Sequence, residues 1–181
     1  RGTSVYFPNG VIPMLPERLS GNLCSLRPNE DRLAYSVSMV VSPRGAVKEY
    51  KIEQSIIQSK RRFTYEEVEE LIKQDKEGKK LSQKDTSFLS SLKMLHMLSN
   101  VLTKNRLRKG SIDFETAEVK FQFDEKGKPI NAEKKVRLES HRLVEECMLL
   151  ANRIVARHIG LPKPEQQVQP FLYRVHDAPD P

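Results

Sequence analysis

One predicted helix carries polar groups that suit contact with a polar ligand. Apolar residues cover most of its circumference, which predicts that the helix is buried. They are Leu143, Val144, Cys147, Met148, Leu150, Ala151, Ile154 and Val155. Glu145 and Asn152 lie seven residues apart, on nearly the same line of the helix. A carboxylate on such a helix must be paired or face a polar cavity, because naked burial costs several kcal/mol. Two interpretations of equal weight follow: Glu145 orders water or a sugar hydroxyl, or Glu145 or Glu146 pairs with an arginine.

Basic runs lie beside aromatic residues in this chain. The runs are residues 60–62, 104–109 and 134–137, with Phe63 and Tyr65 after the first and Phe114 after the second. This alternation of basic and aromatic residues favours single-stranded nucleic acid as the ligand, because its bases stack on aromatic rings and its phosphates attract cations. The net charge of +7 agrees with a polyanionic partner, and we expect Arg61 and Arg62 to contact it. The plainer alternative is that the charges form solvated faces and the rings lie in the core.

Several kinds of site have no motif in the sequence. There is no glycine-rich phosphate loop, HExxH, GxSxG or CxxC motif, and the four histidines are scattered. The seven aspartates never cluster, whereas a two-metal site needs several carboxylates around cations about 4 Å apart. We therefore expect the chain alone to hold no metal. No apolar run approaches the roughly 20 residues of a membrane helix, and two unclustered cysteines favour reduced thiols in the cytoplasm.

The order of expected elements predicts an α+β fold with mainly antiparallel pairing and packed helices. Strands are expected at residues 4–7, 33–41, 47–60, 111–123, about 129–138 and 170–176, and a linker at 160–169. The two strands on either side of residues 42–45 form a hairpin. Its buried face carries Leu33, Tyr35, Val37, Met39 and Val41.

Capping residues set the limits of the three expected helices. Thr64 and Glu67 form a capping-box pattern, and Ser82 and Ser140 suit the N-caps of the second and third helices. Gly110 is placed to end the second helix.

Three segments together resemble the RNB family of 3′-to-5′ exoribonucleases, and ribonuclease R more closely than ribonuclease II. They are TSVYFPNGVIPMLPERLS (3–20) with LCSLRPNEDRL (23–33), RRFTYEEV (61–68), and RLVEECMLLAN (142–152). Two further segments, 110–123 and 171–179, match in register, so the resemblance covers the whole chain, residues 1–181, as part of an RNB catalytic domain.

The resemblance implies a cytoplasmic, processive hydrolase that threads single-stranded RNA into a channel. Two Mg²⁺ ions activate water there, and 5′-mononucleotides are released. It implies catalytic roles for Tyr65, which packs against the terminal nucleotide and helps to set the product size, and for Glu145, which contacts the same nucleotide. It implies that Tyr6 and Phe114 clamp the last stacked bases. Core packing is the alternative role for each.

The aspartate-rich metal motif of the family is expected upstream of Arg1 and its arginine segment downstream of Pro181. We therefore expect an internal fragment of a catalytic domain that is inactive alone. Unpaired strand edges favour its self-association. One alternative is a non-catalytic RNA-binding or scaffold protein with a degenerate RNB domain. Another, an unrelated basic α+β domain, requires the motif matches to be coincidental.

Overall fold

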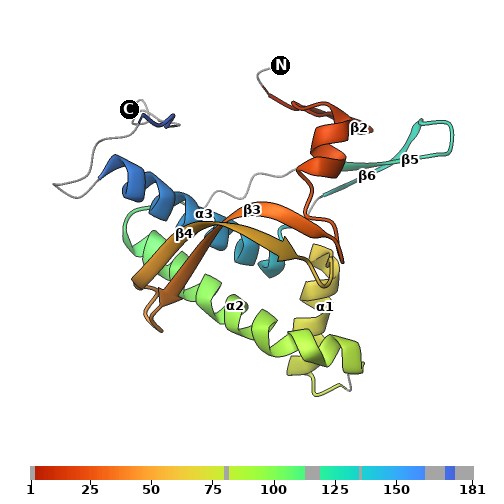
Figure 1. Cartoon of the computed structure of the whole chain (residues 1–181). Coiled ribbons are helices and arrows are strands. Elements are labelled where there is room, and N and C mark those ends of the chain that lie inside the picture. Colours follow the sequence, from red (N-terminus) through yellow and green to blue (C-terminus); the bar gives the residue numbers. More distant parts are fainter. Residues whose placement is uncertain (1–2, 80–81, 113–118, 135, 162–169, 174–181) are drawn as a thin grey trace.

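Three α-helices, a short π-helix and three strand pairs make up the computed structural model, which describes residues 3–79, 82–112, 119–134, 136–161 and 170–173 (Figure 1). The helices are α1 (Tyr65–Lys76), α2 (Gln83–Arg108), α3 (Glu139–Gly160) and a short π-helix, η1 (Arg18–Leu23). The strands are β1 (Val5–Phe7), β2 (Gly10–Ile12), β3 (Asp31–Val41), β4 (Val47–Gln58), β5 (Val119–Phe123) and β6 (Pro129–Lys134). All three pairs are antiparallel, which confirms the predicted α+β class.

The core lies where α1, α2 and α3 meet. Its buried apolar side chains all come from these helices: Val68, Leu71, Ile72, Leu102, Leu143, Leu150 and Ile154. Buried polar residues join them, among them the charged Glu146 at 4% exposure. The β3–β4 hairpin crosses this helical layer, while β1, β2 and the β5–β6 hairpin lie outside it (Figure 1). The helices therefore form the scaffold, and the outer hairpins carry exposed side chains.

The β3–β4 hairpin has the predicted strands but not the predicted burial. Leu33 pairs with Ile56 in the register, and both are largely exposed, at 85% and 70%. Tyr35 is 75% exposed, whereas Val37, Met39 and Val41 are half-buried. The prediction of one continuous buried face was therefore wrong for the Leu33–Tyr35 half. Alternation identifies which side chains share a face, but not how far a covering layer extends.

Two of the three predicted N-caps are confirmed. Thr64 and Glu67 form a capping box at α1, and Ser82 accepts the backbone N–H of Asp85 at α2. Gly110 follows the end of α2 with a φ of 92°, as expected of a residue just beyond a helix C-terminus.

The predicted cap of α3 was wrong, because Ser140 lies inside the first turn and is 2% exposed. Its backbone N–H donates to the Glu69 carboxylate of α1 at 3.1 Å. The Nδ1 atom of His141 accepts the backbone N–H of Leu138 at 3.1 Å. Side chains other than a serine hydroxyl thus satisfy the free N–H groups of this helix end.

Three further expectations differ from the structure. Ser111 and Ile112 lie outside any strand, residues 136–138 follow the end of β6, and residues 170–173 are not in strand conformation. The remainder of the predicted last strand and nearly all of the predicted linker lie outside the described residues.

Helix α3 is not buried all round, since Met148 is 58% and Val144 37% exposed. It packs on α2 and α1 along one side, so the apolar residues of its other side remain accessible.

Candidate nucleic-acid interface

Tyr65 and His141 bring the starts of α1 and α3 together. Their rings are stacked, with centroids 4.1 Å apart and planes inclined by 19°. Tyr65 is the first residue of α1, positioned by the Thr64 capping box, and it remains 42% exposed. One face of the phenol ring is therefore covered by the imidazole, while much of the side chain stays accessible to a ligand. Sequence reasoning missed His141, although its spacing of four residues from Glu145 places both on one side of a helix.

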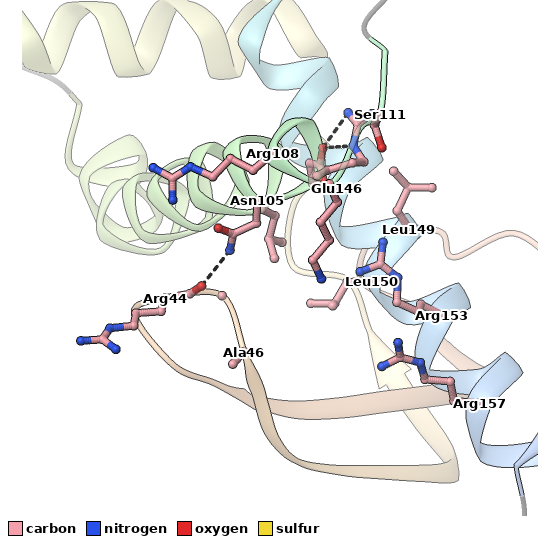
Figure 2. Close-up of a pocket in the computed structure, with 14 residues that line it drawn as sticks. Arg44, Ala46, Asn105, Arg108, Ser111, Glu146, Leu149, Leu150, Arg153 and Arg157 are labelled. Atoms are coloured by element: carbon pink, nitrogen blue, oxygen red, sulfur yellow. Dashed lines mark hydrogen bonds and ion pairs between the residues drawn. The ribbon is translucent and has the colours of Figure 1, made fainter.

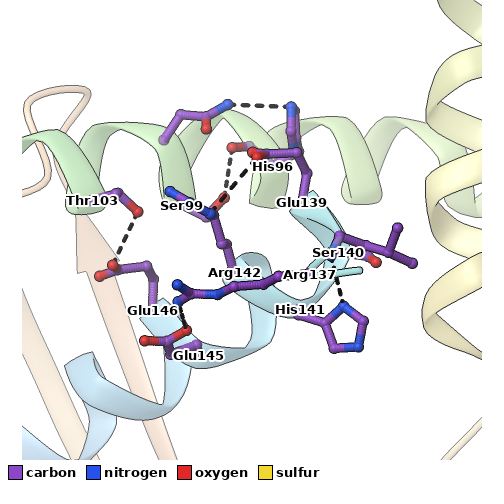
Figure 3. Close-up of polar contacts among 12 residues, drawn as sticks. His96, Ser99, Thr103, Arg137, Glu139, Ser140, His141, Arg142, Glu145 and Glu146 are labelled. Atoms are coloured by element: carbon purple, nitrogen blue, oxygen red, sulfur yellow. Dashed lines mark hydrogen bonds and ion pairs between the residues drawn. The ribbon is translucent and has the colours of Figure 1, made fainter. Parts of the chain in front are cut away.

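Glu145 lies one helical turn after His141 and is held by arginines. Its carboxylate pairs with the Arg137 guanidinium, as Figure 3 shows, and a second guanidinium, that of Arg106, lies 3.9 Å away. The Glu145 side chain is still 40% exposed. The helix therefore presents a positioned, accessible carboxylate beside the stacked rings.

The neighbouring Glu146 has a structural environment. Its Oε1 atom accepts from Thr103 Oγ1 at 3.0 Å (Figure 3) and from Arg106 Nε at 2.9 Å, so that it joins α2 to α3. Both halves of the arginine-pairing interpretation are thus observed, because Glu145 and Glu146 each contact an arginine. Burial, and next the Glu146 carboxylate, raise the pKa of the adjacent Cys147 thiol.

Arg61 and Arg62 have different surroundings. The Arg61 guanidinium pairs with Asp85, lies 4.0 Å from a Glu67 oxygen and stacks over the Phe63 ring at 4.2 Å. Hydrogen bonds from Ser82 and then Arg61 hold the pKa of Asp85 below its ordinary value. Arg62 is exposed and makes no ion pair with any described residue.

The remaining candidate residues lie elsewhere in the chain. Tyr6 is 77% exposed on β1, opposite Val11 of β2, and within the described part of the chain no ring contact joins it to Tyr65. Phe114 lies outside the described residues. The structure therefore places Glu145 one helical turn after the His141 that stacks on Tyr65, and leaves Tyr6 on a separate hairpin.

The described residues do not suit a metal ion. Among them, no group of three or more histidine, cysteine, aspartate or glutamate side chains lies close enough to bind one. The three carboxylates in the first turns of α3, those of Glu139, Glu145 and Glu146, are instead each paired with an arginine. In the same parts of the chain, no helix has the length and apolarity needed to cross a membrane.

A basic surface with exposed aromatic rings is typical of proteins that bind nucleic acid. The chain belongs to the RNB family, since the family model described as RNB domain matches residues 1–181.

Known relatives agree with this assignment. The chain is 42% identical over 179 residues to ribonuclease R 1 of Lactococcus lactis, a match that covers 99% of this chain and 21% of that protein. RNase R of Mycoplasma genitalium, solved in complex with ribose methylated single-stranded RNA, is 31% identical with a TM-score of 0.79. That match covers 88% of this chain and 24% of the other. A yeast pseudonuclease, 17% identical with a TM-score of 0.60 over 88% of this chain and 18% of its own, shares the fold alone.

These matches confirm the resemblance to ribonuclease R that the sequence motifs indicated. The chain spans about a fifth of the length of the Lactococcus relative.

Proposed function

We propose that this chain is part of a hydrolytic 3′-to-5′ exoribonuclease and holds the 3′-terminal nucleotide of single-stranded RNA. The observation that carries the proposal is the stack of Tyr65 on His141, with the accessible Glu145 carboxylate one turn along α3. The solved RNase R with single-stranded RNA supports RNA as the ligand.

The chemistry of each group suggests how it binds the nucleotide. The accessible part of the Tyr65 ring packs against the terminal base, while His141 supports the ring from the opposite face. Glu145 accepts hydrogen bonds from ribose hydroxyls, and Arg137 fixes the orientation of its carboxylate. Arg62 meets a phosphate. Tyr6 and Phe114 clamp the preceding bases. Arg61 acts differently from its neighbour, because its contacts with Asp85 of α2 and Glu67 of α1 make it a positioning residue for the starts of both helices.

The proposed enzyme is processive: it threads RNA through a channel and releases 5′-mononucleotides. Its expected cofactor is Mg²⁺, for which we assign no ligand among the described residues. Residues 1–181 alone are inactive in this proposal, and the longer protein that carries them is active.

The decisive experiment compares the two forms. Each is incubated with Mg²⁺ and a uniformly labelled single-stranded oligoribonucleotide, and the products are separated on a denaturing gel. We expect mononucleotides only from the longer protein. Robust mononucleotide release by the 181-residue chain would contradict its proposed inactivity, and none from either form would contradict the enzymatic function.

A non-catalytic RNA-binding or scaffold protein is the second candidate. The yeast pseudonuclease with this fold supports keeping it, because a fold alone does not determine activity. The same experiment separates the candidates: retained RNA binding without degradation by the longer protein favours the binding protein.

Two smaller proposals concern assembly and location. Each described sheet has only two strands, so each strand has one unpaired edge, and Leu33 and Ile56 are exposed. We therefore expect the 181-residue chain to self-associate, which sedimentation at several concentrations tests. The two cysteines are free thiols, which suits the proposed cytoplasmic location and is checked by cell fractionation.

A further inference from the structure

A basic cavity of about 600 Å³ lies between the β3–β4 turn, the end of α2 and the middle of α3 (Figure 2). Six basic residues line it: Arg44, Arg106, Arg108, Lys109, Arg153 and Arg157. Glu146 is the only acidic residue among the described lining, and Arg106 neutralises it. Figure 2 shows Arg153 and Arg157 extending from α3 toward the space between α2 and the turn. The fold thus brings the basic run at residues 104–109 together with Arg44, Arg153 and Arg157 from two distant segments.

The walls of this cavity are held in place by short contacts. Asn105 Nδ2 donates to the backbone carbonyl of Arg44 at 2.8 Å, which fixes the turn to α2. Gly45 has a φ of 78°, and a Cβ there would lie 3.0 Å from Asn105 Nδ2 and 3.2 Å from Leu102 Cδ2. On the opposite wall, the buried Glu146 holds Arg106. The cavity is therefore formed before any ligand arrives.

Helix dipoles explain only part of the positive charge. Arg106 and Arg108 lie in the last turn of α2 and Arg157 in the last turn of α3, where cations are favourable. Arg44 lies in a strand turn and Arg153 in the interior of α3, so neither has this explanation.

No described residue forms an ion pair with Arg44, Arg108, Lys109, Arg153 or Arg157. These five cations are exposed, so water and salt screen part of their mutual repulsion, and an anion bound among them would lower the repulsion further. A volume of about 600 Å³ lies within the usual range for small-ligand sites.

We propose that this cavity is a phosphate-binding site, separate from the Tyr65–Glu145 site. Guanidinium groups bind phosphate oxygens in a bidentate manner, and several of them around one cavity match a phosphodiester or a nucleoside monophosphate. The source that we favour is the backbone of the RNA strand, outside the terminal-nucleotide site. The choice of the RNA backbone as the source of the phosphate rests on the proposed function, whereas the phosphate site itself does not.

The test uses the 181-residue chain and the double variant R153Q/R157Q. Both arginines are exposed on α3, so the variant is expected to fold, which circular dichroism confirms. The matched control is K73Q/K76Q, which removes two exposed cations from the last turn of α1, away from the cavity. Fluorescence anisotropy measures affinity for a labelled single-stranded oligoribonucleotide across a series of salt concentrations. Inorganic phosphate and 5′-AMP are titrated separately by calorimetry.

If the ligand is the RNA backbone, R153Q/R157Q is expected to weaken RNA binding about tenfold at low salt. The slope of log K against log salt should fall by about 1.4, because the variant loses two phosphate contacts and each contributes about 0.7 to the slope. K73Q/K76Q should leave both values unchanged. If phosphate or 5′-AMP binds and only that binding is lost in R153Q/R157Q, the site takes free phosphates instead. Unchanged binding of all three probes overturns the proposal.

The variant Y65A distinguishes failure of this inference from failure of the proposed function. Loss of stacking should lower RNA affinity without changing the salt slope, because tyrosine carries no charge. A Y65A variant that binds normally, beside a weakened R153Q/R157Q, leaves the phosphate site standing and contradicts the terminal-nucleotide site. The reverse result overturns the phosphate site alone.

Discussion

Glu145 and Glu146 are adjacent in the sequence, yet their side chains are 40% and 5% exposed. Helical geometry turns neighbouring residues by about 100°, so one carboxylate enters the interface with α2 and the other remains at its edge. Arg106 contacts both, at 2.8 Å from Glu146 and 3.9 Å from Glu145. A single guanidinium therefore connects the packing of α2 on α3 to the candidate RNA-binding carboxylate.

This difference predicts that the two carboxylates separate stability from RNA binding. The E146Q variant removes a buried charge and leaves Arg106 without its partner, which should lower the free energy of unfolding by about 2 kcal/mol. The E145Q variant removes an accessible ion pair and should lower the free energy of unfolding by less than about 1 kcal/mol. Urea denaturation monitored by circular dichroism measures both. Equal losses of unfolding free energy in the two variants would show that Glu146 contributes no more to stability than Glu145.

Tyr65 should matter to RNA and little to folding. In the Y65A variant, loss of one base-stacking contact is expected to weaken binding of single-stranded RNA about tenfold. In the longer protein, the same change should lengthen the limit product. The matched control is Y35A, which removes an exposed tyrosine from β3. Anisotropy on the 181-residue chain and gel analysis of end products are the measurements. Matching behaviour of Y65A and Y35A would remove Tyr65 from the site.

Local patterns in the sequence were sufficient to predict most of the helices and strands. The Thr64 capping box, the Ser82 cap and Gly110 define helix ends through contacts within a few residues, so their types carry the information. The long hairpin likewise follows from alternation on both sides of a turn.

Contacts between distant segments were not predictable in this way. The N–H group of Ser140 is satisfied by Glu69, which is 71 residues away, and His141 stacks on a tyrosine of another helix. The exposure of Leu33 and Met148 depends on which layers cover them, and hydrophobic patterning alone does not specify that. Family resemblance supplied Tyr65 and Glu145 as candidates, while only the structure showed that Tyr65 stacks on His141, one helical turn before Glu145.

Asp85 should make stability depend on pH in the acid range. Its pKa is lowered in the folded chain by hydrogen bonds from Ser82 and Arg61, so the folded state favours the ionised form. The resulting stabilisation is present above the unfolded carboxyl pKa and is lost as the pH falls through the lower, folded value. We expect D85N to have a lower Tm than the wild type at pH 7, with the difference vanishing in strong acid. Thermal melts at several pH values measure this, and E125Q, in an exposed turn, is the control. A Tm difference between D85N and the wild type that does not change with pH would mean that the introduced amide, rather than the lost charge, causes it.

The two cysteines should differ in reactivity. Cys24 is exposed, whereas Cys147 is half-buried and has a raised pKa, so less of it is thiolate at a given pH. With iodoacetamide at pH 8, we expect Cys24 to be alkylated first, as followed by peptide mass spectrometry. In urea the rates should converge, because unfolding removes the burial that protects Cys147. Faster labelling of Cys147 in the folded chain would contradict its partial burial there.

Gly45 and Gly127 offer a matched test of the contact between the β3–β4 turn and α2. Both have positive φ, 78° and 76°, so alanine at either position carries a similar backbone strain of about 1 kcal/mol. At Gly127 nothing lies within 4 Å of an added Cβ, whereas at Gly45 the new methyl group meets Asn105, Leu102 and Val101 at 3.0–3.2 Å. We therefore expect G45A to lower the free energy of unfolding by about 1 kcal/mol more than G127A, through overpacking. The turn also forms one wall of the basic cavity, so G45A should weaken phosphate binding there while G127A does not. Denaturation and calorimetry on the two variants measure both effects, and equal stabilities would mean that the turn is not seated against α2.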